Sequence, residues 1–151
     1  MRMWRYKFVP LMFIFFGISE CSNIPGEQLP PNISVEIENQ TIDASRGGYK
    51  WETKSLFSNT GVIADAADPI RIGEGLIAQS VVPNSTAIVK YSDGSNPTII
   101  ANLWEGQNQT KTLPVKDSEI TLPSDKGRHV IEIYTEWKNG RTSYTFVVEV
   151  K

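Results

Sequence analysis

The stretch that decides the fold is residues 129–150, HVIEIYTEWKNGRTSYTFVVEV, close to the C-terminal end of the sequence. Apolar and polar residues alternate on both sides of Asn139-Gly140, and Asn-Gly is the pair that type I′ hairpin turns prefer. We therefore predict two antiparallel strands, His129 to Trp137 and Thr142 to Val150, which are joined by a two-residue type I′ loop.

The loop length predicts the register of this hairpin, and the register predicts which side chains share a face. With Lys138 opposite Arg141, an apolar row forms from the pairs Thr135 with Tyr144, Ile133 with Phe146, Ile131 with Val148 and His129 with Val150. The other face carries Glu132 and Glu136, and we expect it to be in water. A slip of one residue would bury both glutamates, so the assignment of residues to the two faces is well determined.

Short β-rich runs continue upstream, and no window of 11 residues has helical periodicity. We predict one all-β domain over residues 33–151, with further strands at Ile33–Ile37, Tyr49–Glu52, Leu76–Val81, Thr86–Tyr91, Thr98–Trp104, Thr110–Leu113 and Glu119–Leu122. Turn-forming residues such as Gly47-Gly48 and Ser92-Asp93-Gly94 separate these runs. The segment from Ser55 to Gly75 is the least regular, and we expect a long surface connection there.

The N-terminus has the organisation of an export signal. Three basic residues within Met1 to Lys7 precede an apolar run of 11 residues, Phe8 to Ile18. This run matches the hydrophobic region of a signal peptide and is well short of the ~20 residues that span a bilayer. We predict that residues 1–20 are a cleaved signal peptide and that the polar, Pro-rich residues 21–32 are a flexible tether.

Cys21, the only cysteine, directly follows the predicted signal. Ile18-Ser19-Glu20-Cys21 resembles the lipobox of bacterial lipoproteins, in which the cysteine is diacylated and becomes the new N-terminus. The resemblance implies that Cys21 is the lipid-attachment residue and that the membrane is a partner. Glu20 departs from the pattern, because a small residue usually precedes the cysteine. The alternative is ordinary secretory cleavage after Ser19, which would leave a secreted protein with a free thiol.

The charge of the exported part argues against nucleic acid as a partner. The whole sequence contains 15 Lys and Arg and 17 Asp and Glu, and 12 basic and 16 acidic residues remain after residues 1–20 are removed. These 12 form no basic cluster in the sequence. Nucleic acid and anionic membrane surfaces both require a basic footprint, so we expect neither to be bound electrostatically.

A second motif extends the fold prediction. Asp125-Lys-Gly-Arg-His-Val-Ile131 has the spacing of the Asp-x-Gly-x-Tyr-x-Cys run that opens strand F of many immunoglobulin domains. His129 occupies the tyrosine-corner position, and Ile131 occupies the position of a core cysteine. A generic turn before a strand would also contain Asp and Gly. The hairpin that follows favours the immunoglobulin-like interpretation, because its predicted inner row already contains Ile131.

Other stretches extend this resemblance over residues 33–151, namely Gly48-Tyr-Lys-Trp51, Ala64-Asp65, Asp68-Pro69 and Leu122-Pro123, together with the aromatic residues of the last hairpin. With them the chain resembles the bacterial Ig-like domain of small Gram-positive, YhfM-like lipoproteins. The resemblance implies an immunoglobulin-like antiparallel β-sandwich held at the cell envelope, outside the cytoplasm. It implies no catalytic activity.

Few residues could support catalysis or bind a metal. His129 is the sole histidine, and its predicted place on the inner face favours a structural role over that of a catalytic base. One histidine and one cysteine exclude a conventional zinc site. Five acidic residues of irregular segments do not match the spacing of a calcium loop, and we interpret them as solvated: Asp65, Asp68, Glu74, Asp117 and Glu119. We expect no enzyme activity, no cofactor and no metal.

Two binding functions remain. The leading hypothesis is a non-enzymatic interaction domain that binds another envelope component through loops or a strand edge. The alternative is a module that binds a small ligand or carbohydrate through Trp51, Trp104 or Trp137, because sugar rings stack on exposed aromatic side chains. All three tryptophans lie in or at the ends of predicted strands, which favours packing over ligand binding.

Overall fold

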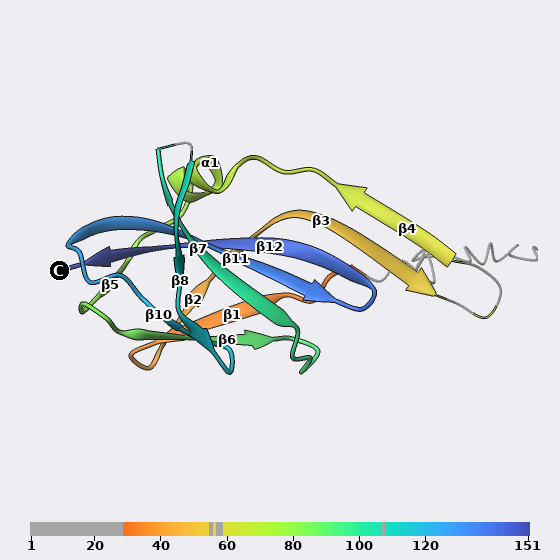
Figure 1. Ribbon diagram of the computed structural model, residues 1–151, viewed down its shortest axis with the longest axis horizontal. Coiled ribbons are helices and arrows are strands. Elements are labelled where there is room, and N and C mark those ends of the chain that lie inside the picture. The colour runs from red at the N-terminus through yellow and green to blue at the C-terminus, as the bar shows by residue number, and fades with distance from the viewer. Residues whose placement is uncertain (1–28, 55, 57–58, 107) are drawn as a thin grey trace, which may run out of the picture.

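The computed structural model describes residues 29–54, 56, 59–106 and 108–151. The predicted signal peptide, Cys21 and most of the predicted tether lie outside the described residues. The described part is mostly strand, arranged in two sheets that pack face to face as a sandwich (Figure 1). The prediction of an all-β sandwich is therefore confirmed.

Two sheets form the sandwich. The first has the strand order β2-β1-β6-β10-β9 and contains β1 (Ile33–Ile37), β2 (Gln40–Asp43), β6 (Thr86–Tyr91), β9 (Val115–Lys116) and β10 (Glu119–Thr121). The second has the order β4-β3-β12-β11-β7-β8 and contains β3 (Ser45–Lys54), β4 (Asn59–Ala64), β7 (Thr98–Glu105), β8 (Asn108–Leu113), β11 (Gly127–Trp137) and β12 (Gly140–Val150). A short strand, β5 (Gln79–Val81), pairs in parallel with the end of β12, and every other pairing is antiparallel.

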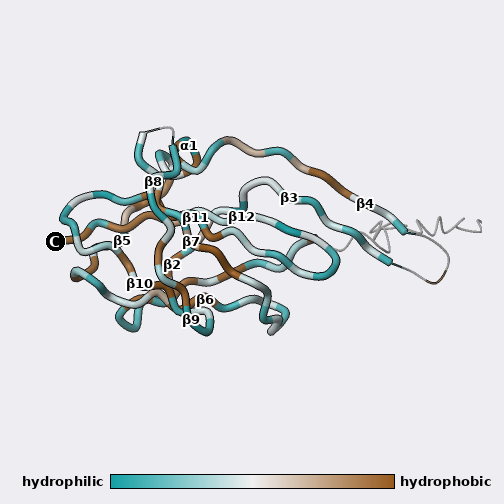
Figure 2. The backbone as a smooth tube through the Cα atoms, viewed as in Figure 1, coloured by the Kyte–Doolittle hydropathy of each residue, from teal (hydrophilic) through white to brown (hydrophobic). Residues whose placement is uncertain are grey.

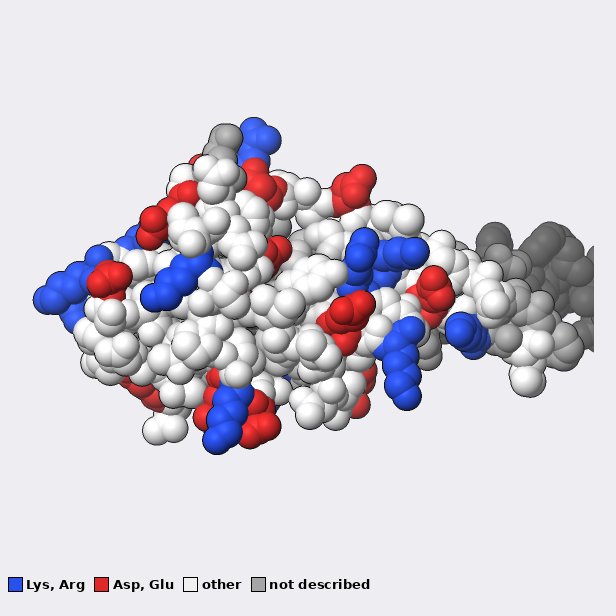
Figure 3. Space-filling view, in the orientation of Figure 1, with Lys and Arg blue, Asp and Glu red and all other residues white. Residues whose placement is uncertain are grey.

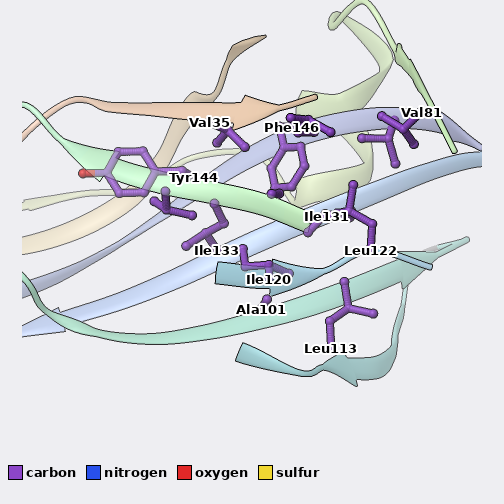
Figure 4. Packing of buried hydrophobic residues seen from close by; sticks show 14 of the residues in the cluster. Val35, Val81, Ala101, Leu113, Ile120, Leu122, Ile131, Ile133, Tyr144 and Phe146 are labelled. Atoms are coloured by element: carbon purple, nitrogen blue, oxygen red, sulfur yellow. The ribbon is translucent and has the colours of Figure 1, made fainter. Parts of the chain in front are cut away.

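The core lies between the inner faces of the two sheets (Figure 4). Phe146 and Tyr144 of β12 and Ile131 and Ile133 of β11 are at most 1% exposed, and they pack against residues of the first sheet such as Val35. Apolar residues are gathered in these central strands, and polar residues dominate the loops (Figure 2). The apolar row predicted from the last hairpin is thus the inner face of the second sheet.

The register of that hairpin differs from the prediction by two residues. Trp137 pairs with Gly140 and Ile131 pairs with Phe146, so the loop is Lys138-Asn139 and not Asn139-Gly140. His129 consequently lies opposite Val148. Side chains alternate with a period of two, so an error of two residues leaves every side chain on its predicted face.

The physical reason why position 140 is a glycine also differs from the prediction. Neither Asn139 nor Gly140 has a positive φ, so the loop is not the predicted type I′ turn. A Cβ atom on Gly140 would lie 2.5 Å from the carbonyl oxygen of Lys50 and 2.5 Å from the ring of Trp51. Glycine is required here because β3 passes close to the end of β12.

Type I′ geometry occurs instead in two loops of the first sheet. Glu38 and Asn39, which join β1 to β2, have φ values of 50° and 65°, and Asp117 and Ser118, which join β9 to β10, have values of 50° and 67°. Both loops lack glycine, so the usual sequence signal is missing. Because this signal is missing, the short strands β2 and β9 were not predicted.

The segment from Ser55 to Gly75 was predicted to be a surface connection and contains two regular elements. Strand β4 pairs with β3, and helix α1 (Pro69–Glu74) starts at Asp68, whose side chain accepts a hydrogen bond from the Arg71 N–H at 3.0 Å. The helix packs on the outer face of β11 and β12, where Gly73 lies against Val130 and Val147. Part of the face that we expected to be in water is therefore covered. No helix among the described residues is long and apolar enough to cross a membrane.

Strand β3 extends past the sandwich together with β4. The N–H of Glu52 donates to the carbonyl of Asn139 in the β11–β12 loop at 2.7 Å, and beyond this point β3 pairs with β4 alone. We call Glu52–Lys54 and Asn59–Gly61, with Leu56 between them, the arm. It projects from the same end of the sandwich as the β11–β12 loop (Figure 1).

Candidate functional site

Three aromatic side chains close the end of the sandwich from which the arm projects. Trp137 packs edge to face against Trp51, with ring centroids 5.2 Å apart, and against Tyr91, at 5.4 Å. The Nε1–H of Trp137 donates to the hydroxyl oxygen of Ser95 at 2.9 Å. Because the three rings come from β3, β6 and β11, the cluster joins the two sheets.

Beside this cluster, residues Pro30–Asn32 lie across the end of the sandwich, and we call them the strap. Arg46 donates to the carbonyl of Pro30 at 2.8 Å and to Oδ1 of Asn32 at 2.5 Å. The hydroxyl of Tyr144 donates to the carbonyl of Pro31. Pro30 and Pro31 are buried. The last residues of the predicted tether are therefore docked on the domain.

A hollow of about 590 Å³ lies at the strap and is lined by Leu29, the strap residues, Arg46, Trp51, Ser92 and Asp93. Within the described residues, Nε of Arg46, Nε1 of Trp51 and the hydroxyl of Tyr91 are buried and have no hydrogen-bond partner. Such groups are normally paired with protein or with ordered water. Two of these three groups belong to residues that line the hollow, Arg46 and Trp51.

Burial changes the acidity of the two tyrosines at this end. It raises the pKa of Tyr144 to about 12, and the nearby Arg46 opposes this shift. Burial, with a smaller contribution from Tyr144, also raises the pKa of Tyr91. Hydrogen bonds from Ser95 lower the pKa of the exposed Asp93 carboxyl. Both tyrosines are neutral at physiological pH, so they serve as hydrogen-bonding and packing groups.

The three tryptophans named as weak ligand-binding candidates do not form one surface. Trp51 and Trp137 meet at one end, but Trp104 lies opposite Val130, seven residues along β11 from Trp137. Its Nε1–H donates to the Glu132 carboxylate at 3.0 Å. Trp51 is only 5% exposed, so its ring face is not available for stacking against a sugar.

His129 has the surroundings of a structural residue. It is 8% exposed, and its Nε2 lies 2.7 Å from the backbone carbonyl oxygen of Asp125. This contact joins the start of β11 to the backbone four residues upstream. With Nε2 held by a carbonyl, the ring is not arranged as a catalytic base beside a nucleophile.

Two of the acidic residues considered for calcium, Asp68 and Glu74, border one hollow, and the other three do not line it. Among the described residues, no three His, Cys, Asp or Glu side chains form a group that could hold a metal ion. Asp68 serves as the N-cap of α1. Asp117 lies in the β9–β10 loop.

The feature that sequence reasoning missed is strand β4, which is an outer edge of the second sheet. It contains six residues, NTGVIA, with neither charge nor proline, and Ile63 is 71% exposed. Figure 2 shows β4 at the outside of the molecule, brown towards the end nearer α1 and teal at the opposite end. The consecutive apolar residues 62–64 were the available signal, but this run is only three residues long.

A scan against protein-family models finds no match, and no curated protein and no solved structure matches this chain significantly.

Proposed function

We propose that this chain is an exported lipoprotein of a Gram-positive envelope, tethered through Cys21, whose immunoglobulin-like domain is a non-enzymatic interaction module. Its partner is an extended segment of another envelope protein, which adds a strand to the open edge of β4. The exposed, uncharged β4 edge is the observation that carries this proposal.

The edges of the two sheets differ in how they are protected. Natural sheets protect edges with charged residues or by keeping the strand short. Strand β8 carries Lys111, β2 carries Asp43, and β9 has two residues, one of which is Lys116. Strand β4 has six residues and no charged side chain, so neither kind of protection is present. An edge of this kind presents free backbone N–H and C=O groups, which is the surface that strand addition uses.

The strand order supports the immunoglobulin-like assignment. In the first sheet β1-β6-β10-β9 corresponds to the order A-B-E-D, and in the second β7-β11-β12 corresponds to C-F-G. In this assignment β2, β3, β4 and α1 are an insertion after strand A. The bond from His129 to the Asp125 carbonyl and the complete burial of Ile131 also agree with it.

The aromatic cluster gives less support to the carbohydrate-binding alternative. Trp51 is buried, and Trp137 uses its Nε1–H within the protein. A sugar platform needs at least one ring face in contact with solvent. The β4 edge therefore remains the better candidate for a binding surface.

The proposal can be tested by photo-crosslinking in intact cells. A benzophenone amino acid replaces Thr60, an exposed residue of β4, in the full-length chain with and without Ile63→Lys. We expect a crosslinked protein partner that Ile63→Lys abolishes, because a lysine protects the edge. The same probe at Ile77, which is 97% exposed at a distance from β4, is the control. The proposal is wrong if the Thr60 probe captures nothing, or captures only what the Ile77 probe captures.

A further inference from the structure

We propose that the hollow at the strap binds a short proline-rich peptide, and that the strap occupies part of this site as an internal ligand. The incoming peptide displaces the strap and uses hydrogen-bond donors that the strap leaves unpaired. The site lies at the end of the sandwich, whereas the partner of the proposed function is assigned to the edge of β4. The two assignments can therefore fail independently.

The side chains that β3 contributes to the hollow are hydrogen-bond donors. Nε of Arg46 and Nε1 of Trp51 are both buried, and neither has a partner within the described residues. A guanidinium group and an indole N–H can donate hydrogen bonds but cannot accept them. Trp51 is only 5% exposed, so its unpaired N–H is a buried polar group of a kind that is rare in folded proteins. A ligand that suits these two groups offers acceptors and brings few donors.

Proline-rich segments have this hydrogen-bonding character. A proline has a backbone carbonyl but no N–H, and its ring holds φ near about −65°. The residue before a proline is also restricted to extended conformations. Such segments therefore present carbonyl acceptors with little loss of conformational entropy, and they dock in grooves bordered by aromatic side chains. Trp51 borders the hollow and packs against Trp137.

The strap shows how this end of the sandwich holds a segment of that kind. Pro30 and Pro31 are buried, and the carbonyl groups of both accept hydrogen bonds, from Arg46 and from the Tyr144 hydroxyl respectively. Oδ1 of Asn32 accepts a second bond from Arg46. Both bonds from Arg46 use Nη2, and Nε remains unpaired. The strap is therefore an incomplete ligand for the donors around it.

The hollow has room for more chain than the strap provides. Its volume is about 590 Å³, and pockets that bind small ligands typically measure about 300–1,000 Å³. A longer proline-rich segment can repeat the strap's bonds to Arg46 and Tyr144 and add an acceptor for the N–H of Trp51. Such a peptide competes with the strap, so its apparent affinity rises when the strap is held less firmly.

The charges near the hollow favour an uncharged ligand. One basic and one acidic residue line it, Arg46 and Asp93. Basic and acidic side chains are also mixed over the face of the described part that Figure 3 displays. Because neither sign dominates, the site exerts little net attraction on a charged peptide. A run of prolines has no side-chain charge and is compatible with this balance.

Peptide binding to variants of the full-length chain tests the inference. The probe is hexaproline with a fluorescein label, and binding is followed by fluorescence anisotropy. Labelled hexaglycine is the control peptide, because it has as many carbonyl groups but keeps its N–H groups and its flexibility. Asn32→Ala removes the side-chain acceptor through which Arg46 holds the strap. Trp51→Phe removes the unpaired N–H, and Trp104→Phe is its matched control, because Nε1 of Trp104 donates to Glu132.

We expect hexaproline to bind the parent chain and hexaglycine to bind about tenfold more weakly, since glycine loses more conformational entropy. Asn32→Ala should tighten hexaproline binding about fivefold, and Trp51→Phe should weaken it by about the same factor, which corresponds to one hydrogen bond. Trp104→Phe should leave the affinity unchanged. Asn32 is exposed, so Asn32→Ala tests the competition even if Trp51→Phe does not fold.

Three results would each overturn the inference. The first is that hexaproline binds neither the parent chain nor Asn32→Ala, or binds no more tightly than hexaglycine. The second is that Asn32→Ala binds hexaproline no more tightly than the parent chain, because the strap would then not be a competitor. The third is that folded Trp51→Phe and Trp104→Phe have equal affinities for hexaproline, because the unpaired N–H would then have no role in binding.

Discussion

Replacement of Gly140 by alanine tests why the last hairpin has its register. The added Cβ would lie 2.5 Å from the Lys50 carbonyl oxygen, which is backbone and cannot rotate away, and 3.0 Å from Cα of Trp51. Strand β3 must then move away from β12, and the hydrogen bond from Glu52 to Asn139 is weakened. Overpacking of this kind costs about 1–3 kcal/mol. Loss of one hydrogen bond adds about 1 kcal/mol.

We therefore expect Gly140→Ala to lower the free energy of unfolding by about 2–4 kcal/mol. Urea denaturation followed by tryptophan fluorescence measures this as a lower midpoint at unchanged slope. Gly61→Ala is the control, because no atom lies within 4 Å of the position that its Cβ would take and its φ is not positive. Its stability should be unchanged or raised by roughly 0.5 kcal/mol.

A second control separates close packing from turn geometry. If Asn139-Gly140 formed a type I′ turn, Asn139→Ala would also be costly, because position 139 would need a positive φ. In the structure its side chain makes only a 3.4 Å bond to the Glu52 carbonyl, so we expect a change within about 0.5 kcal/mol. The reasoning is refuted if Gly140→Ala is as stable as the parent, or if Asn139→Ala is equally damaging.

Three further outcomes are expected. Phe146→Ala, at a residue that is 0% exposed, should cost about 3–5 kcal/mol in urea denaturation, and a loss under 1 kcal/mol would contradict the assigned core. Folding raises the pKa of Tyr144 from 10.0 to about 12, so stability should be complete below pH 10 and fall as the pH rises towards 12. Tyr144→Phe should make this fall shallower, and an unchanged pH profile would argue against the buried hydroxyl. Added bacterial oligosaccharides should leave the tryptophan emission unchanged because Trp51 is buried, and saturable quenching would favour the carbohydrate-binding alternative.

The inner and outer faces of the last hairpin were predictable because they depend only on the alternation of apolar and polar residues within the hairpin itself. Alternation with a period of two assigns Ile131, Ile133, Phe146 and Val148 to one face, and this assignment survives a register error of two residues. The turn itself was not predictable. Gly140 is required by Lys50 and Trp51 of β3, which lie some 90 positions away in the sequence.

The elements that were missed are those whose stability comes from contacts with distant parts of the chain. Helix α1 has six residues, too few for a helical period to be seen, and it is held by packing of Gly73 against Val130 and Val147. Strand β4 has a single partner, β3, so only half of its hydrogen-bonding groups are used. Few contacts constrain its side chains, so its sequence, NTGVIA, does not show the alternation that is typical of a strand.

The candidate site could be predicted only in part. Trp51 and His129 were placed in predicted strands, and both side chains are buried, as residues on the inner face of a sheet usually are. It could not find that Trp51 meets Trp137, or that Arg46 and Tyr144 hold the strap, because these contacts depend on how the two sheets are packed.

The intact mass of the protein extracted from the membranes of its own cells tests the central claim most directly, because the tether defines where the interaction module works. The account predicts a chain that begins at Cys21 and carries the added mass of a diacylglyceryl group. A chain that begins at Glu20 without added mass would contradict it, since cleavage after Ser19 leaves a secreted protein with a free thiol and no anchor.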